Sequence, residues 1–133
     1  MAYAGYLIQV GSYTIPNAYI KTESYSVTYN TMDLEPYRDA DGVLHRNALP
    51  HKAVKIEFET PIMYASDFAT FINNIRAQYL DAVEKDLMAT FYVFELDDYV
   101  TQKVYVPDIT TEILQNSKRG FVLNPCRLAF IGY

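Results

Sequence analysis

The clearest alternation of apolar and polar positions lies in residues 51–60, HKAVKIEFET. Lys55, Glu57 and Glu59 fall on one side of an extended chain, and the large apolar residues fall on the other. These apolar residues are Val54, Ile56 and Phe58. The pattern predicts a half-buried strand, and Pro61 follows directly as a strand terminator.

The period of the pattern changes after Pro61. The next apolar side chains recur at i, i+3, i+4, i+7 and i+11, which is one stripe of an α-helix. They are Phe68, Phe71, Ile72, Ile75 and Tyr79. We predict a helix over residues 66–84, capped by Ser66 or Asp67. The helix is expected to cover a sheet, with Phe68, Phe71, Ile72 and Ile75 packed against Val54, Ile56 and Phe58.

The remaining patterns predict strands. Residues 3–10 and 24–29 alternate, a weak strand is possible around residues 12–15, and residues 89–107 resemble a hairpin that turns at two aspartates, 97 and 98. Short strands are expected at 109–115 and 121–133. No repeat or linker interrupts residues 1–133, so we expect one domain. Its fold class is mainly β (α+β): an antiparallel β-sandwich or barrel-like sheet with one flanking α-helix.

Composition narrows the class of protein. The chain has 133 residues, of which 50% are hydrophobic, which is enough for one core. It shows no signal peptide and no apolar run long enough to span a bilayer, so we expect synthesis in the cytoplasm and no membrane insertion. A lone cysteine, Cys126, excludes an intrachain disulfide and fits a small buried residue. The net charge of −5 disfavours specific nucleic-acid binding.

The aromatic content points to surfaces rather than to chemistry. The chain contains 13 tyrosines and 7 phenylalanines but no tryptophan. Tyrosine suits strands, and it also suits interfaces that are half buried and half wet. We therefore expect a strand-rich protein that contacts other proteins.

Residues 35–61 raise the question of a metal site, because they contain acids, a glycine and two histidines. A calcium loop needs oxygen ligands at positions 1 and 12 and a glycine at position 6. With Gly42 at position 6, Tyr37 and Ala48 occupy positions 1 and 12, and the loop fails. His45 and His51, even with Asp39 or Asp41, share no helical face, so no metal is expected.

Catalytic motifs are equally lacking in the sequence. It contains no Gly-x-Ser-x-Gly, no glycine-rich phosphate loop and no HExxH, and no carboxylate pair stands out by its spacing. We expect neither an enzyme nor a cofactor.

The stretch DADG, residues 39–42, is typical of a hairpin turn. The residues on either side of it are predicted to form the two strands of a protruding arm at about residues 33–50. A polar segment of this length between two core strands is uncommon in a compact domain unless it has a function. We expect the arm to pack on a neighbouring subunit; the alternative is an ordinary solvated loop. The candidate contact residues are Asp33, Tyr37, Arg38, Asp39, Asp41, Gly42, His45 and Arg46.

These residues also carry a resemblance. It rests on the segment D-x-x-x-x-R-x-x-x-G-x-x-x-R (Asp33, Arg38, Gly42, Arg46), the strand KAVKIEFETP, the helix, the stretch FYVFELDDYVTQKVYVPD and a final apolar strand. In this order, the chain resembles a family of small proteins from phages and prophages of Gram-positive bacteria. The resemblance covers most of the chain, although NALPH at 47–51 departs from the usual version. None of the motifs is diagnostic of a reaction.

The resemblance implies a virion tail component with the tail-tube fold shared by tube, distal-tail and baseplate-ring proteins. It implies a homo-oligomeric ring, commonly a hexamer, that contacts neighbouring tail proteins and whose long loop reaches an adjacent ring or subunit. The charge of −5 agrees with a conduit through which DNA slides. Two alternatives are a carbohydrate- or receptor-binding β-sandwich at the tail tip, and a phage chaperone or adaptor outside the virion.

Overall fold

The computed structural model describes residues 3–133, apart from the side chains of residues 30 and 31. Fourteen elements follow one another in this range. They are β1 (Ile8–Val10), β2 (Tyr13–Thr14), the 3-10 turn η1 (Asn17–Tyr19), β3 (Ser26–Asp33), β4 (Tyr37–Arg38), β5 (Leu44–His45), β6 (Ala48–Glu59), β7 (Met63–Tyr64), α1 (Ala65–Arg76), β8 (Asp86–Val93), β9 (Asp98–Tyr105), β10 (Ile113–Ser117), β11 (Gly120–Leu123) and β12 (Arg127–Gly132).

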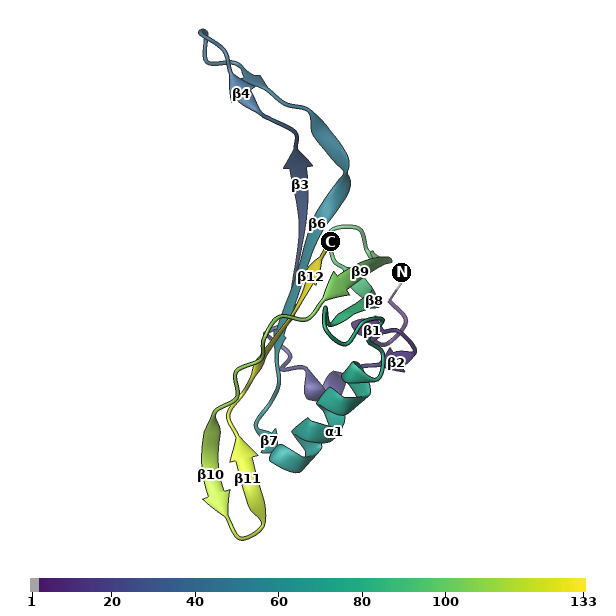
Figure 1. Ribbon diagram of the computed structural model, residues 1–133, viewed down its shortest axis with the longest axis vertical. Helices are drawn as coiled ribbons and strands as arrows, with labels where there is room; N and C mark the ends of the chain where they lie inside the picture. Colours follow the sequence, from purple (N-terminus) through teal and green to yellow (C-terminus); the bar gives the residue numbers. More distant parts are fainter. Residues whose placement is uncertain (1–2) are drawn as a thin grey trace.

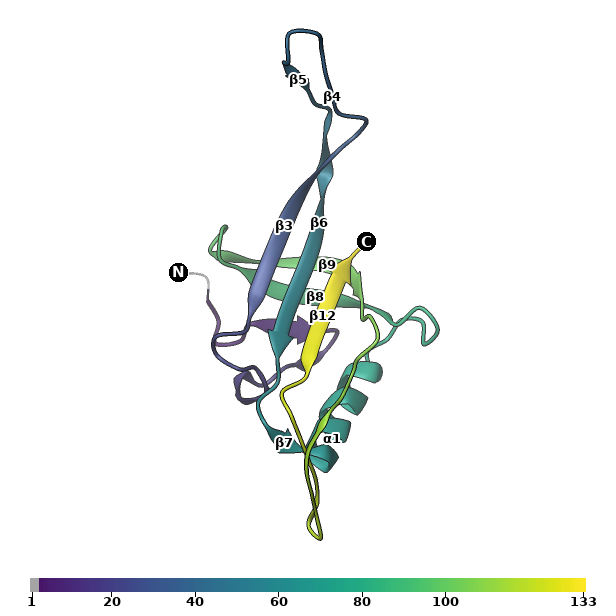
Figure 2. The same cartoon turned by 90° about the vertical axis from the view of Figure 1, so that its left-hand side faces the viewer.

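The main sheet has seven strands in the order β2-β1-β8-β9-β12-β6-β3, and all its pairings are antiparallel. A three-stranded sheet, β10-β11-β7, and a two-stranded one, β4-β5, complete the described strands. Figure 2 shows β8 and β9 crossing behind β3, β6 and β12, and Figure 1 shows the same two groups of strands side by side, so the main sheet folds over on itself into two layers. Hence the expectation of a mainly β protein with antiparallel sheets and one helix is confirmed for the described residues.

The two layers are joined at a narrow seam between β9 and β12. Its ladder has two residue pairs, Ile131 with Tyr105 and Gly132 with Val104, and Tyr133 N–H continues it to the Lys103 carbonyl at 3.2 Å. A Cβ atom at Gly132 would lie 2.8 Å from the Gln102 side-chain nitrogen and 3.1 Å from a backbone nitrogen of β6. The Gln102 side chain could turn away, but the backbone of the neighbouring strand β6 leaves a Cβ little room, so glycine is favoured at this position.

The hydrophobic core lies between the two layers and α1. All seven residues expected at the helix–sheet contact are buried in a single cluster: Val54, Ile56, Phe58, Phe68, Phe71, Ile72 and Ile75. The Phe71 ring lies 5.0 Å from that of Tyr19 and 6.5 Å from that of Tyr13, centroid to centroid. The helix face thus also packs on aromatic side chains of η1 and β2.

The helix is shorter than its apolar stripe predicts. It ends at Arg76 rather than at residue 84, so Tyr79 packs on the core from outside the helix. The chain leaves the helix because Leu80 and Asp81 donate their N–H groups to the carbonyl and the carboxylate of Asp86. These hydrogen bonds replace the i to i−4 bonds of another helical turn.

The expected helix cap is also wrong. Tyr64 occupies the N-cap position and makes no side-chain capping hydrogen bond, while Ser66 lies inside the helix. Asp67 lies in the first turn, where a carboxylate is favoured by the helix dipole.

Several strand boundaries differ from the pattern. The first strand is limited to Ile8–Val10, and the long hairpin runs from Asp86 to Tyr105 with its turn at residues 94–97 rather than at 97 and 98. The positive φ of Asp97, 48°, belongs to that turn. The final segment is two strands, since residues 124–126, which include Pro125, separate β11 from β12. β11 instead pairs with β10 and β7.

No helix within residues 3–133 is long and apolar enough to cross a membrane.

A buried ion pair fixes the start of β8. Asp86 is 3% exposed, and its carboxylate lies 3.1 Å from Lys103 Nζ and accepts the N–H of Asp81 at 2.9 Å. Burial favours the neutral acid, but the hydrogen bonds from Lys103 and Asp81, together with the lysine charge, outweigh it and hold the pKa of Asp86 below its usual value. The ionised carboxylate therefore stabilises the folded state.

We expect Phe71→Ala to lower the free energy of unfolding by about 3–5 kcal/mol, because it removes a large buried ring and leaves a cavity. The measurement is a urea or guanidinium melt. Asn73→Ala, an exposed position on the same helix, is the control and should change stability by less than about 0.5 kcal/mol. A loss of less than about 1 kcal/mol at Phe71 would contradict its burial.

Asp86 should make stability depend on acid. A carboxyl whose folded pKa lies below its unfolded value of about 3.9 stabilises the fold above that pH and loses this contribution as the pH falls through the folded pKa. We expect Asp86→Asn to lower the melting temperature at pH 7 and to flatten its decline between about pH 5 and about pH 2. Glu95→Gln, on the exposed turn, should leave the profile of the wild type unchanged.

Candidate functional site

The candidate site is the arm, residues 33–50, together with the exposed strands at the opposite end of the molecule. β3 and β6 pair from Ser26 with Glu57 to Thr31 with Lys52, and the register then shifts to Asp33 with Ala48. The pairing ends with a hydrogen bond from Leu34 N–H to the Asn47 carbonyl at 2.9 Å. Figures 1 and 2 show this ribbon leaving the body and ending in β4 and β5. The expected arm is therefore a projecting β-hairpin, although its base already belongs to β3 and β6.

An ion pair stabilises the root of the arm. Arg46 donates from Nε and from a terminal nitrogen to the carboxylate of Asp33 at 3.1–3.2 Å, a forked arrangement that fixes both partners. The hydrogen bonds and charge of Asp33 raise the pKa of the Arg46 guanidinium. Glu35 follows Asp33 with a left-handed φ of 47°, and the chain bends there.

Asp39 organises the tip of the arm. One carboxylate oxygen accepts the N–H groups of Asp41 at 2.9 Å and Val43 at 3.1 Å, and the other lies 2.9 Å from His45 Nε2. The hydrogen bond with His45, followed by those from Val43 and Asp41, keeps the pKa of Asp39 below its ordinary value. The turn is thus closed by a side chain as well as by Gly42, whose φ is 83°.

The limbs of the tip also contact each other. The rings of Tyr37 and His45, which are paired across the strands, stack at 4.8 Å with planes 8° apart. Arg38 donates to the Gly42 carbonyl at 2.8 Å. The predicted arm residues therefore form two groups, Asp33 with Arg46 at the root and residues 37–45 at the tip, and the contacts within each group stabilise the shape of the arm.

The sequence analysis missed the apolar part of the arm. Five large apolar side chains are 42–60% exposed along it and at its root: Met32, Leu34, Tyr37, Val43 and Leu44. Only Tyr37 was among the candidates. The sequence did contain a signal for them, because apolar residues flank the polar turn. In a ribbon with no layer on either side these residues have no core to enter, so they must be exposed.

The opposite end of the molecule carries a second exposed group. There β10, β11 and β7 form their own sheet below the body (Figure 1), with the side chains of Tyr64 and Val122 on paired positions. Exposed apolar residues line this end: Ile62, Tyr64, Ile113, Leu114 and Phe121. The two projecting hairpins thus point away from each other and both expose apolar side chains.

The main sheet also has free edges. β3 is its last strand on one side and β2 its last strand on the other. β3 is eight residues long, so it presents a row of backbone groups that can pair with another strand.

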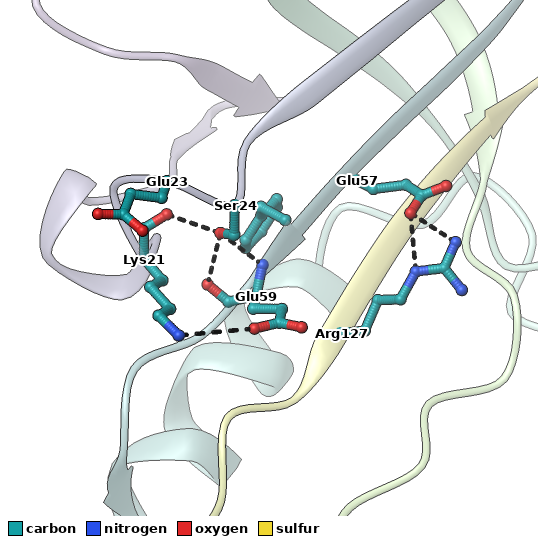
Figure 3. A pocket seen from close by; sticks show the side chains of 7 residues that line it. Lys21, Glu23, Ser24, Glu57, Glu59 and Arg127 are labelled. Carbon is teal, nitrogen blue, oxygen red and sulfur yellow. Dashed lines mark hydrogen bonds and ion pairs between the residues drawn. The ribbon is translucent and has the colours of Figure 1, made fainter.

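A hollow of about 310 Å³ lies on the outer face of the sheet beside the loop before β3. Figure 3 shows an ion-pair row across it, in which Glu57 lies 2.6 Å from Arg127 and Glu59 lies 4.0 Å from Lys21. Hydrogen bonds from Lys55 and Arg127 lower the pKa of Glu57. The Ser24 hydroxyl is hydrogen-bonded to backbone atoms of residues 21 and 59. These contacts form a surface network that ties the loop before β3 to β6, and β6 to β12.

The histidines occupy separate places. His45 belongs to the arm tip, whereas His51 Nε2 contacts the backbone oxygen of Tyr133. Over residues 3–133, no group of three or more histidine, cysteine or acidic side chains is placed to hold a metal ion. Cys126 is buried against the Thr110 carbonyl, and burial raises the pKa of its thiol.

The comparisons with known proteins agree with this geometry. Residues 1–133 match the model of a family of unknown function, DUF6711. The chain belongs to this family. No curated protein matches it. A chain from the tail of an empty GTA particle, solved by helical refinement with C6 symmetry, is similar in structure, with a TM-score of 0.55 and 13% identity over 100% of this chain and 94% of that one.

At this identity the likeness concerns the fold. The expectation of a mainly β fold that resembles tail proteins is confirmed, while the link to Gram-positive hosts stays a prediction. The DUF6711 match gives the chain a family without giving it an activity.

We expect the arm tip to loosen in Asp39→Ala, because two backbone N–H groups lose their acceptor. Hydrogen exchange followed by NMR should show faster exchange at the amides of Asp41 and Val43. Asp41→Ala leaves the Asp39 carboxylate in place and should keep the Val43 amide protected. Equal exchange in the wild type and Asp39→Ala would contradict the role given to Asp39.

Proposed function

We propose that this DUF6711 chain is a structural subunit of a phage-like tail, and that it works by assembly into a closed ring rather than by catalysis. The observation that carries the proposal is the similarity of fold, over the whole chain, to a chain of a tail with C6 symmetry. The surfaces described above support it, because they provide exposed strand edges and projecting hairpins.

Ring closure follows from the free edges of the main sheet. An exposed strand edge invites pairing with another chain, and a ring of subunits pairs each edge without leaving any open. β3 offers eight residues on one side of the sheet, while β2 lies on the other side. Different surfaces of neighbouring copies would meet, which is the contact that generates rotational symmetry. Six copies are proposed by analogy with the C6 tail.

The arm is proposed as the part of each subunit that reaches a neighbour. Its side-chain hydrogen bonds from Asp33 to Arg46 stay within the arm, and its apolar side chains are exposed. An internally ordered hairpin loses little conformational entropy when it binds, so it is well suited to an interface. The position of the ring in the tail (tube, distal tail or baseplate) depends on the proteins that lie above and below it.

The direct test is a reconstruction of intact particles together with mass spectrometry of the purified virion. The proposal expects the chain in the tail, in closed rings of equal copies. Absence of the chain from the particle, or its presence as unconnected single copies, would refute it.

Removal of the arm provides a test on the isolated protein. We expect replacement of residues 34–47 by Asn-Gly, between the paired residues Asp33 and Ala48, to give a folded subunit that assembles poorly. Circular dichroism and the melting temperature should stay close to those of the wild type, while native mass spectrometry or particle incorporation shows the loss of oligomers. Collapse of the dichroism would place the arm in the subunit's own fold, and normal assembly would make it a solvated loop.

A further inference from the structure

The two projecting hairpins differ in charge. Residues 33–47 of the arm contain four acids and two arginines, a net charge of −2 with His45 neutral. The hairpin of β10 and β11 contains two adjacent bases, Lys118 and Arg119, at its turn. Figure 1, drawn with the longest axis vertical, places the two turns at opposite ends of the molecule.

Part of this charge is already used inside the subunit. Asp33 binds Arg46, Asp39 binds His45, and Arg38 binds a backbone carbonyl. The carboxylates of Glu35 and Asp41 form no ion pair within the described residues. Equally, neither Lys118 nor Arg119 has an acidic partner in residues 3–133. With His45 neutral, Asp39 keeps its charge, and the hydrogen bond of Arg38 to a neutral carbonyl leaves the arginine charge in place. Residues 33–47 therefore keep a net charge of −2, whereas the β10–β11 turn keeps two positive charges.

Apolar side chains lie next to both sets of charges. Val43 and Leu44 are exposed near the arm turn, and Leu114 and Phe121 are exposed near the basic turn. In an interface with an apolar centre and opposite charges at its edge, the apolar contact contributes affinity and the charges fix the orientation of the partners. Two like ends would repel each other, so the charges favour one end meeting the other.

We propose that the arm tip of one copy docks on the β10–β11 turn of the next copy, head to tail. Glu35 and Asp41 would face Lys118 and Arg119, and the apolar side chains would cover one another. Such a contact uses two different surfaces and so propagates along an axis, as stacked rings require. The inference rests on the proposed function for its setting in a tail, but the contact itself needs only two copies of this chain.

The first experiment reverses the charges. Glu35→Lys with Asp41→Lys, and separately Lys118→Glu with Arg119→Glu, should each weaken end-to-end association of the purified protein by about tenfold or more at low salt. The chain that carries all four changes restores opposite signs and should associate within about threefold of the wild type. Sedimentation velocity measures the association, and added salt should weaken it in the wild type.

The second experiment does not depend on charge. One tagged copy carries Asp41→Cys, another carries Arg119→Cys, and mild oxidation should give a disulfide-linked heterodimer on a non-reducing gel. Glu95→Cys, an exposed acid on the 94–97 turn, is the matched control partner for each. Cys126 is buried and stays out of the reaction.

Two results would overturn the inference. One is a yield of the 41–119 disulfide that is no higher than the yield of the 41–95 or the 119–95 disulfide. The absence of any 41–119 disulfide at the highest attainable protein concentration counts as the same result. The other is a fourfold variant that stays as weak as the single-end variants. Ring closure is scored separately by native mass spectrometry: rings without the 41–119 link refute this contact alone, whereas the link without rings refutes the proposed ring.

Discussion

The pairing of β3 with β6 is the interaction on which the rest of the molecule depends. β6 is twelve residues long, and its two halves meet different conditions. The half that carries Val54, Ile56 and Phe58 lies under the second layer and has a core to face. The other half runs past the end of that layer and pairs with β3, with further contacts from His51 to the backbone oxygen of Tyr133 and from Gln102 to the Lys52 carbonyl. One ladder therefore makes both the main sheet and the arm.

The body is built to leave this ladder free at its outer edge. The sheet turns over at the seam between β9 and β12, so β8 and β9 lie behind β3, β6 and β12 and leave the outer edge of β3 open (Figure 2). The helix α1 and the aromatic rings of η1 and β2 fill the remaining side of the core. As a consequence, the parts that hold the fold together lie on one side of β6, and the parts available to neighbours lie at its edge and at the two ends.

The sequence pattern predicts those parts of the structure that depend on burial of one face of a strand or helix. The alternation at Val54, Ile56 and Phe58 and the stripe from Phe68 to Ile75 identify the core, because burial on one face imposes its period directly. The end of α1 escaped prediction, since it depends on hydrogen bonds to Asp86 across a turn. The polar residues of the arm were identifiable from the DADG turn. Its exposed apolar residues were not, because an alternating strand looks the same with or without a layer to cover it.

The continuity of β6 has a mechanical consequence. At about 3.4 Å per residue, twelve residues span roughly 40 Å as a single covalent strand. The same backbone enters the core at one end and carries the arm at the other. An irregularity lies on this path, because the β3–β6 ladder shifts register between Thr31 and Asp33. A pull or tilt applied to the arm therefore reaches the strand that holds Val54, Ile56 and Phe58 through this bulge, which is the point where the ribbon can bend.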